Sequence, residues 1–170
     1  LQGGADDDTF RDGLGGDTIY GGTTLADDGI ATIDTAIYAA GAIIGWNGTA
    51  WTVNSGANGT DVLYGIEKLT IGTQSYWLVD GTGNGAFVTL QEANDAATAG
   101  DTVLVAPVTL SGASSITKGL TILGLNNDGV VGTGARGAES VLSGSVTVTA
   151  AAAGLVTFDG LKFLNTTASG

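Results

Sequence analysis

Aspartate residues are concentrated in the first fifth of the chain, which holds eight of the 17 acidic residues. They are Asp6, Asp7, Asp8, Asp12, Asp17, Asp27, Asp28 and Asp34. Because the chain has no His and no Cys, a Ser-His-Asp triad, a Cys-His pair and a zinc site of nitrogen and sulfur ligands are excluded. A metal ion bound here must be held by oxygen, which favours a hard cation, above all calcium.

The overall composition narrows the class of protein. The chain has 170 residues, a net charge of −12 and a pI near 4.1, which disfavours binding to nucleic acid and to anionic membranes. A mean hydropathy of +0.29 with 13% charged residues indicates a folded chain, and no apolar run reaches the ~18 residues of a membrane span. The 30 glycines and one proline favour tight turns and β-structure over long helices.

A nine-residue period organises the start of the chain. The sequence is GGADDDTFR at residues 3–11 and DGLGGDTIY at residues 12–20, followed by a new Gly-Gly pair. Asp8 and Asp17 fall at the sixth position, and an apolar residue stands at the eighth position of each repeat. This is the G-G-x-G-x-D-x-U-x pattern, which is typical of a parallel β-roll with glycine-rich turns.

The pattern resembles the haemolysin-type calcium-binding repeats of the RTX family of secreted bacterial proteins. The resemblance implies that calcium lies between turns on one side of the roll, two repeats apart, bound by turn carbonyls and sixth-position carboxylates. The ligands expected on this basis are Gly3, Ala5, Asp7, Asp8, Asp12, Leu14, Gly16, Asp17, Asp27, Asp28 and Asp34. Without the ion, stacked carboxylates would repel one another, so we expect ion binding and folding to be coupled.

The third repeat departs from the pattern, because its sixth position would be Ala26, with Asp27 and Asp28 just beyond it. We therefore predict an insertion, after which the pattern resumes at Asp34-Thr35. Asp6 also departs, since it stands where the family has glycine.

Residues 35–80 predict short strands and turns. The pairs Asn47-Gly48 and Asn58-Gly59 are turn signals, and a small β-meander fits this spacing. The segment 59–80 resembles the one that caps such rolls. Its expected core residues are Leu63, Ile66, Leu69, Ile71 and Leu78. Glu67 and Lys68 are interpreted as solvated surface charges.

The spacing of apolar and turn residues changes at GTGNG, residues 81–85, and we predict a domain boundary there. We predict a calcium-binding domain at 1–80, a linker at 81–86 and a second domain at 87–170. The second domain opens with a helix, because Thr89 and Glu92 have the spacing of a capping box. Gly100 is expected to close this helix.

Short apolar runs follow the predicted helix. They lie at Thr102–Ala106, Leu120–Gly124, Ser140–Gly144, Val146–Ala150, Leu155–Asp159 and Leu161–Leu164. Their spacing favours two to three coils of a solenoid, with an antiparallel sandwich as the alternative. Residues 87–164 resemble the right-handed parallel β-helix proteins of the pectate-lyase-like superfamily, whose opening helix caps the first coil. The predicted fold is therefore all-β: a short RTX parallel β-roll with a small β-meander, then a helix-capped right-handed parallel β-helix.

Some members of that superfamily are polysaccharide lyases or epimerases, which need a base, a proton donor and a group that neutralises the uronate. Only Arg136 and Glu139 resemble this set, and we interpret them as a turn residue and its salt-bridge partner. We therefore expect no enzymatic activity. Four aromatic residues could form a platform that binds a sugar or could complete a small core, and we favour the core. These residues are Trp46, Trp51, Tyr76 and Trp77.

The sequence thus predicts a calcium-binding structural module of a secreted or cell-surface bacterial protein, exported by a type I route and folding on calcium binding. The alternative is an accessory region of an extracellular polysaccharide lyase or epimerase. Expected partners are calcium ions, the rest of a longer repeat protein or a second copy bound head to tail, and an extracellular glycan.

Overall fold

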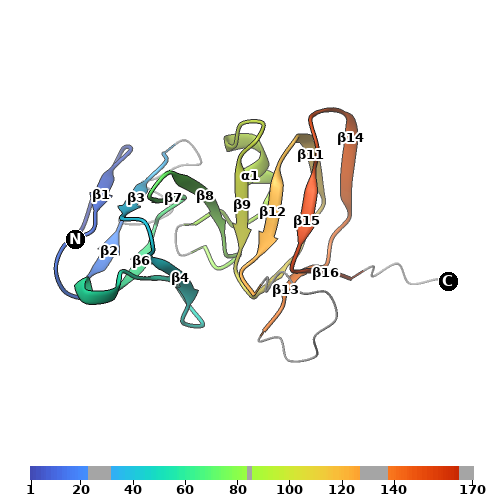
Figure 1. The fold of residues 1–170 in the computed structure, drawn as a ribbon. Coiled ribbons are helices and arrows are strands. Elements are labelled where there is room, and N and C mark those ends of the chain that lie inside the picture. The colour runs from blue at the N-terminus through green and yellow to red at the C-terminus, as the bar shows by residue number, and fades with distance from the viewer. Residues whose placement is uncertain (23–31, 84–85, 127–137, 165–170) are drawn as a thin grey trace. The chain divides into compact units, whose positions relative to one another are not determined.

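The computed structural model describes residues 1–22, 32–83, 86–126 and 138–164, with side chains described for all of these except 150–153. The structure is mostly β, with 46% strand and one short helix, which confirms the all-β prediction at this level. The chain forms two compact units (Figure 1). The first comprises Leu1–Leu78 and Thr82–Phe87, and the second comprises Val79–Gly81 and Val88–Gly170. The described residues contain no helix long and apolar enough to cross a membrane.

The first unit contains two groups of paired strands. Its strands are β1 (Thr9–Arg11), β2 (Thr18–Tyr20), β3 (Thr35–Tyr38), β4 (Ile43–Trp46), β5 (Trp51–Asn54), β6 (Thr60–Tyr64), β7 (Lys68–Ile71) and β8 (Gln74–Val79). Strands β1, β3 and β7 pair in parallel in this order, and β8 pairs antiparallel with β7. In the other group β2 pairs in parallel with β6, and β6, β5 and β4 form an antiparallel meander.

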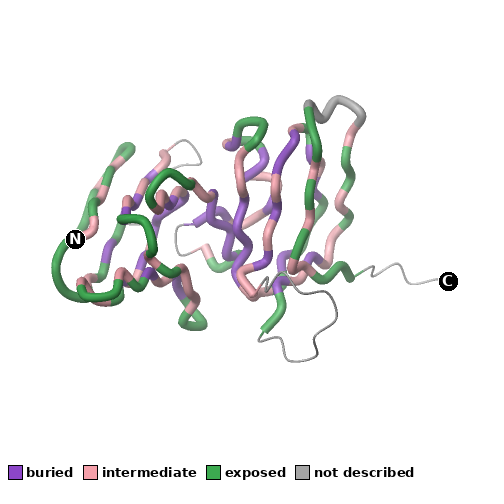
Figure 2. The backbone as a smooth tube through the Cα atoms, in the orientation of Figure 1, coloured by how far each residue is buried: buried purple, intermediate pink, exposed green. Residues whose placement is uncertain are grey.

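Strands that are consecutive in the sequence thus alternate between the two groups at the start of the chain. Thr9 lies opposite Thr35, 26 residues later, where an unbroken nine-residue period would place its partner 18 residues later. This register confirms the predicted insertion and the resumption of the pattern at Asp34-Thr35. Ile19 and Leu69, from the two groups, are almost fully buried. Figure 2 shows buried segments in the strands of the first unit.

The core residues expected from the sequence are mostly confirmed. Leu63, Ile66, Leu69 and Leu78 are buried, whereas Ile71 is half-buried because it lies in the last position of β7. The predicted meander is also confirmed. Asn47 forms the turn between β4 and β5, where its Oδ1 accepts hydrogen bonds from the backbone N–H groups of Thr49 and Ala50. A 3-10 turn at Gly56–Asn58 leads into β6.

The second unit contains three groups of strands. They are β9 (Thr102–Val105), β10 (Thr109–Leu110), β11 (Ser114–Lys118), β12 (Thr121–Gly124), β13 (Ser140–Leu142), β14 (Val146–Ala153), β15 (Thr157–Asp159) and β16 (Leu161–Phe163). The orders are β9-β12-β15, β10-β13-β16 and β11-β14, and every pairing within them is parallel. This parallel pairing contradicts the antiparallel sandwich for the described residues. Strands β10 and β11 were not among the predicted runs.

The helix of the second unit, α1 (Leu90–Ala96), follows the predicted capping box. The Thr89 side chain accepts from the Glu92 backbone N–H, and the Glu92 carboxylate accepts from the Thr89 backbone N–H. The predicted helix end is wrong, because Ala97 is already extended and the helix stops there. Gly100 has a positive φ of 96°, but its N–H bonds to the Gly119 carbonyl rather than closing the helix.

Helix α1 packs along β11. The Gln91 Oε1 accepts from the Ser115 backbone N–H at 2.7 Å, and the Asn94 Oδ1 accepts from the Thr117 backbone N–H at 3.2 Å. Lys118 Nζ donates to three carbonyls at the end of α1, at 2.6–2.9 Å. The helix therefore satisfies backbone donors on the side of β11 that does not pair with β14.

Candidate metal centre

Acidic residues precede three parallel strands of the first unit at equivalent positions. Asp8, Asp34 and Glu67 stand directly before β1, β3 and β7, and we call them the first acid column. The Asp8 backbone N–H donates to Asp34 Oδ1 at 2.7 Å, and the Asp34 backbone N–H donates to Glu67 Oε2 at 2.7 Å. The carboxylates of Asp34 and Glu67 thus each bind the backbone just before the neighbouring strand of the ladder.

The first acid column lies against glycine backbone. A Cβ atom placed on Gly3 would collide with Asp8 Oδ2 and would lie 2.5 Å from the Gly21 carbonyl oxygen. A Cβ on Gly21 would collide with the Gly65 carbonyl and would lie 2.5 Å from Asp34 Oδ2. The same pairing of a carboxylate and a carbonyl oxygen around a glycine therefore occurs twice, because only glycine permits this approach.

The second carboxylate oxygen of Asp8 carries the clearest signal of a ligand. Oδ2 of Asp8 is buried, and within the described ranges it has no hydrogen-bond partner. A buried carboxylate oxygen without a donor is costly, and a cation is one way to compensate it. No group of three or more acidic side chains in the described parts of the chain is arranged to hold a metal ion, so backbone carbonyls would have to supply much of the coordination.

A second acid column precedes β2 and β6. It consists of Asp17 and Asp61, which occupy equivalent positions in the register of these strands. The Asp17 backbone N–H donates to Asp61 Oδ1 at 2.8 Å, and the Tyr38 hydroxyl donates to Asp61 Oδ2 at 2.7 Å. Asp61 is only 1% exposed. Burial, together with the hydrogen bond to Asp61 and the nearby negative charges, strongly raises the pKa of Tyr38, so its hydroxyl stays protonated.

The remaining expected ligands lie in varied surroundings. Asp12 accepts from Ser55 Oγ at 3.3 Å and from Asn58 Nδ2 at 3.1 Å, and Asp7 accepts from the Ile33 backbone N–H at 2.8 Å. The residues expected to contribute carbonyls are exposed, namely Gly3, Ala5, Leu14 and Gly16. Asp27 and Asp28 lie outside the described residues.

Sequence reasoning missed two members of these columns, Glu67 and Asp61, and the tyrosine that donates to Asp61. The interpretation of Glu67 as a surface charge is wrong, because its side chain is 8% exposed and accepts from the Asp34 backbone. Asp61 and Tyr38 were not considered as part of the site. A signal for Asp61 exists in the sequence, since DTIY at 17–20 and DVLY at 61–64 share the order acid, variable residue, apolar residue, tyrosine.

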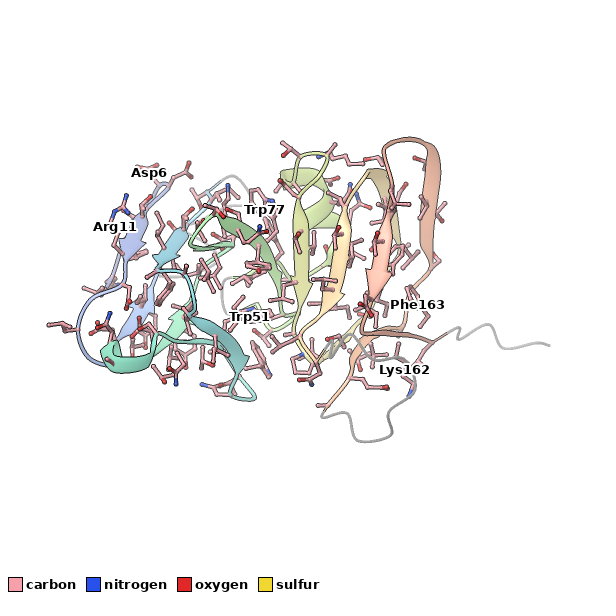
Figure 3. All side chains as sticks on the ribbon, viewed as in Figure 1. Asp6, Arg11, Trp51, Trp77, Lys162 and Phe163 are labelled. Atoms are coloured by element: carbon pink, nitrogen blue, oxygen red, sulfur yellow. The ribbon has the colours of Figure 1, made fainter. Side chains whose placement is uncertain are left out.

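The aromatic residues are divided between core and surface. Trp51 and Trp77 are buried, at 1% and 7% exposure, which confirms the core interpretation for these two residues (Figure 3). Trp46 and Tyr76 are half-buried. Trp46 packs edge to face on Trp51 at 5.5 Å, and Lys68 Nζ lies 5.0 Å from the centre of the Trp77 ring.

The pair considered for sugar chemistry is described only in part, because Arg136 lies outside the described residues. Glu139 forms an ion pair with Lys162 at 3.6 Å, on a well-exposed surface (Figure 3 labels Lys162). Exposed pairs of this kind contribute little to stability.

Comparison of the chain with protein-family models, with curated proteins and with solved structures gives no match.

Proposed function

We propose that this chain is a calcium-binding structural module of a secreted or cell-surface bacterial protein, without enzymatic activity. In this proposal the first unit is an RTX-type parallel β-roll, and the second is the capped start of a right-handed parallel β-helix. The observation that carries the proposal is the buried Asp8 Oδ2, which has no donor among the described residues and lies beside the Gly21 carbonyl oxygen.

The donor set of the first acid column fits calcium. Asp8 and Asp34 supply carboxylate oxygens, and the neighbouring turns supply backbone carbonyls from residues such as Gly3, Ala5 and Gly21. Carboxylate and carbonyl oxygens in a flexible arrangement are the ligands that calcium prefers. When bound, the ion would neutralise the negative charge of this column of carboxylates. Arg11 is exposed, and among the described residues it forms no ion pair with the column.

A calcium-dependent module suits an extracellular setting, because calcium is abundant there and scarce in the cytosol. Extracellular calcium modules bind with Kd values of about 10⁻⁴–10⁻³ M. With such affinities the first unit would stay weakly folded before export and become ordered after it, a coupling of binding to folding.

The test is a denaturant titration of the whole chain in chelator and in 10 mM calcium. All three tryptophans, Trp46, Trp51 and Trp77, lie in the first unit, so their fluorescence reports that unit alone. Calcium should stabilise it by about 1.4–2.7 kcal/mol, the mass-action value for Kd values of about 10⁻³–10⁻⁴ M. Magnesium at the same concentration is the control. An identical fluorescence transition in chelator and in calcium would contradict the proposal.

We propose a mechanical role for the second unit, as a spacer or adhesive stalk that contacts another copy or further coils. Several large apolar side chains are exposed on its last strands and the adjoining turns, at 41–83%: Val148, Leu155, Phe163 and Leu164. Light scattering across a calcium titration measures self-association directly. Growth of mass supports assembly between copies, whereas a monomer at every concentration leaves the spacer role, and a glycan stays a predicted partner.

A further inference from the structure

The two acid columns of the first unit differ in how their second carboxylate oxygens are satisfied. In the first column Asp8 Oδ2 is buried without a donor in the described residues. In the second column both oxygens of Asp61 accept short hydrogen bonds, one from the Asp17 backbone and one from the Tyr38 hydroxyl. The two columns therefore differ in the partners that their carboxylates find within the chain.

Tyr38 stabilises the Asp61 carboxylate by a hydrogen bond, in the position where a bound cation would otherwise compensate the charge. Its hydroxyl lies 2.7 Å from Asp61 Oδ2, and both side chains are nearly inaccessible, at 3% and 1% exposure. Burial, the hydrogen bond to Asp61 and the nearby carboxylates raise the pKa of Tyr38, which favours the protonated hydroxyl that donates this bond. Hydrogen bonds from neutral donors to a buried carboxylate are among the stronger ones in proteins.

The carboxylate of Asp12 is also hydrogen-bonded by side chains of the first unit. Its two oxygens accept from Ser55 Oγ and Asn58 Nδ2. Ser55 and Asn58 belong to the segment between β3 and β6, which interrupts the nine-residue period with the β4–β5 hairpin. The segment that interrupts the nine-residue period thus supplies two hydrogen-bond donors to Asp12, a residue of the second repeat.

We infer that Asp61 of the second acid column and the neighbouring Asp12 are held by the chain's own donors, Tyr38, Ser55 and Asn58, in place of an ion, so that calcium binding is confined to the first acid column. This inference rests on the proposed function for its calcium part. It disagrees with the resemblance, which makes Asp12 and Asp17 calcium ligands.

Calcium affinity of two matched variants of the full chain tests the confinement. Asp8→Asn should weaken binding at least about tenfold, a change of 1.4 kcal/mol. Asp17→Asn should leave the calcium affinity and the number of bound ions unchanged within about twofold, as measured by isothermal titration calorimetry and equilibrium dialysis. Loss of an ion in Asp17→Asn would overturn the inference while leaving the proposed function intact. Absence of calcium binding by the unmodified chain would overturn the proposed function and the confinement together.

Tyr38→Phe tests the chain's own donor independently of where calcium binds. The variant keeps the ring and removes only the hydroxyl that donates to Asp61. Tryptophan fluorescence in saturating calcium should show the unfolding temperature of the first unit lowered by about 4–8 °C. A further tenfold increase in calcium should not restore it. Tyr76→Phe is the matched control, because Tyr76 is half-buried on β8. An unchanged unfolding temperature in Tyr38→Phe, or full recovery on adding calcium, would refute the inference.

Discussion

The two units solve the same structural problem with different chemistry. In each, side chains satisfy backbone N–H groups beside parallel strands. The first unit uses carboxylates, as where Glu67 accepts from the Asp34 backbone, and these acceptors are buried. The second unit uses neutral amides, as where Gln91 and Asn94 accept from β11, and a lysine that caps the carbonyls of α1.

The difference teaches which unit should respond to ions. A column of carboxylates gains hydrogen bonds but accumulates like charge in a partly desolvated place, and this charge needs a counterion or strong donors. Neutral amides carry no such requirement. We therefore expect the stability of the first unit to depend on calcium and salt. The stability of the second unit should be the same with and without them.

The largest effect is expected from Gly21→Ala. A Cβ at this position would collide with the Gly65 carbonyl and press on Asp34, so the ladder must open. We expect a loss of about 3 kcal/mol in the first unit, the upper part of the range for overpacked sites, seen as an earlier fluorescence transition in urea. Gly13→Ala is the control, since its Cβ would lie 3.6 Å from Asp17 Oδ2, an ordinary contact. Equal losses in the two variants would show that the close glycine approach does not matter.

Asn94→Ala should remove the corresponding side-chain acceptor of a backbone N–H group in the second unit. Asn94 is fully buried, and its truncation leaves the Thr117 backbone N–H without its acceptor. We expect a loss of about 2 kcal/mol, equal in chelator and in calcium. Far-UV circular dichroism should record it while the tryptophan fluorescence transition stays unchanged. Ser111→Ala, at an exposed position directly after β10, is the control. A calcium-dependent loss would erase the proposed contrast between the units.

The nine-residue period allowed one member of each acid column to be predicted, because a strict repeat places Asp8 and Asp17 at equivalent positions. It also located the insertion, since Asp34-Thr35 restores the order of acid and threonine. The period could not reveal Asp61 or Glu67. They follow the hairpin and a shortened turn, and their roles depend on pairings between strands far apart in sequence.

In the second unit, the capping box of α1 was evident because it is local. The lysine cap was not, because Lys118 reaches the end of α1 from β11, more than 20 residues away. The short strand β10, with two residues, is too short to carry a periodic signal.

The smallest effect concerns the backbone of the first turn. Asp6 has a positive φ of 76°, and Gly15, nine residues later, has a φ of 96°, so both occupy the fourth position of the repeat in the same left-handed region (Figure 3 labels Asp6). Because a residue with a Cβ atom is strained there, Asp6→Gly should stabilise the first unit by about 0.5 kcal/mol. Asp7→Gly should do the opposite, since Asp7 accepts from the Ile33 backbone and has no positive φ. The same urea titration measures both variants. If Asp7→Gly stabilised the first unit, the loss of a negative charge in this turn would outweigh the lost hydrogen bond and the backbone entropy. Repulsion between carboxylates would then be the main difference between the two units.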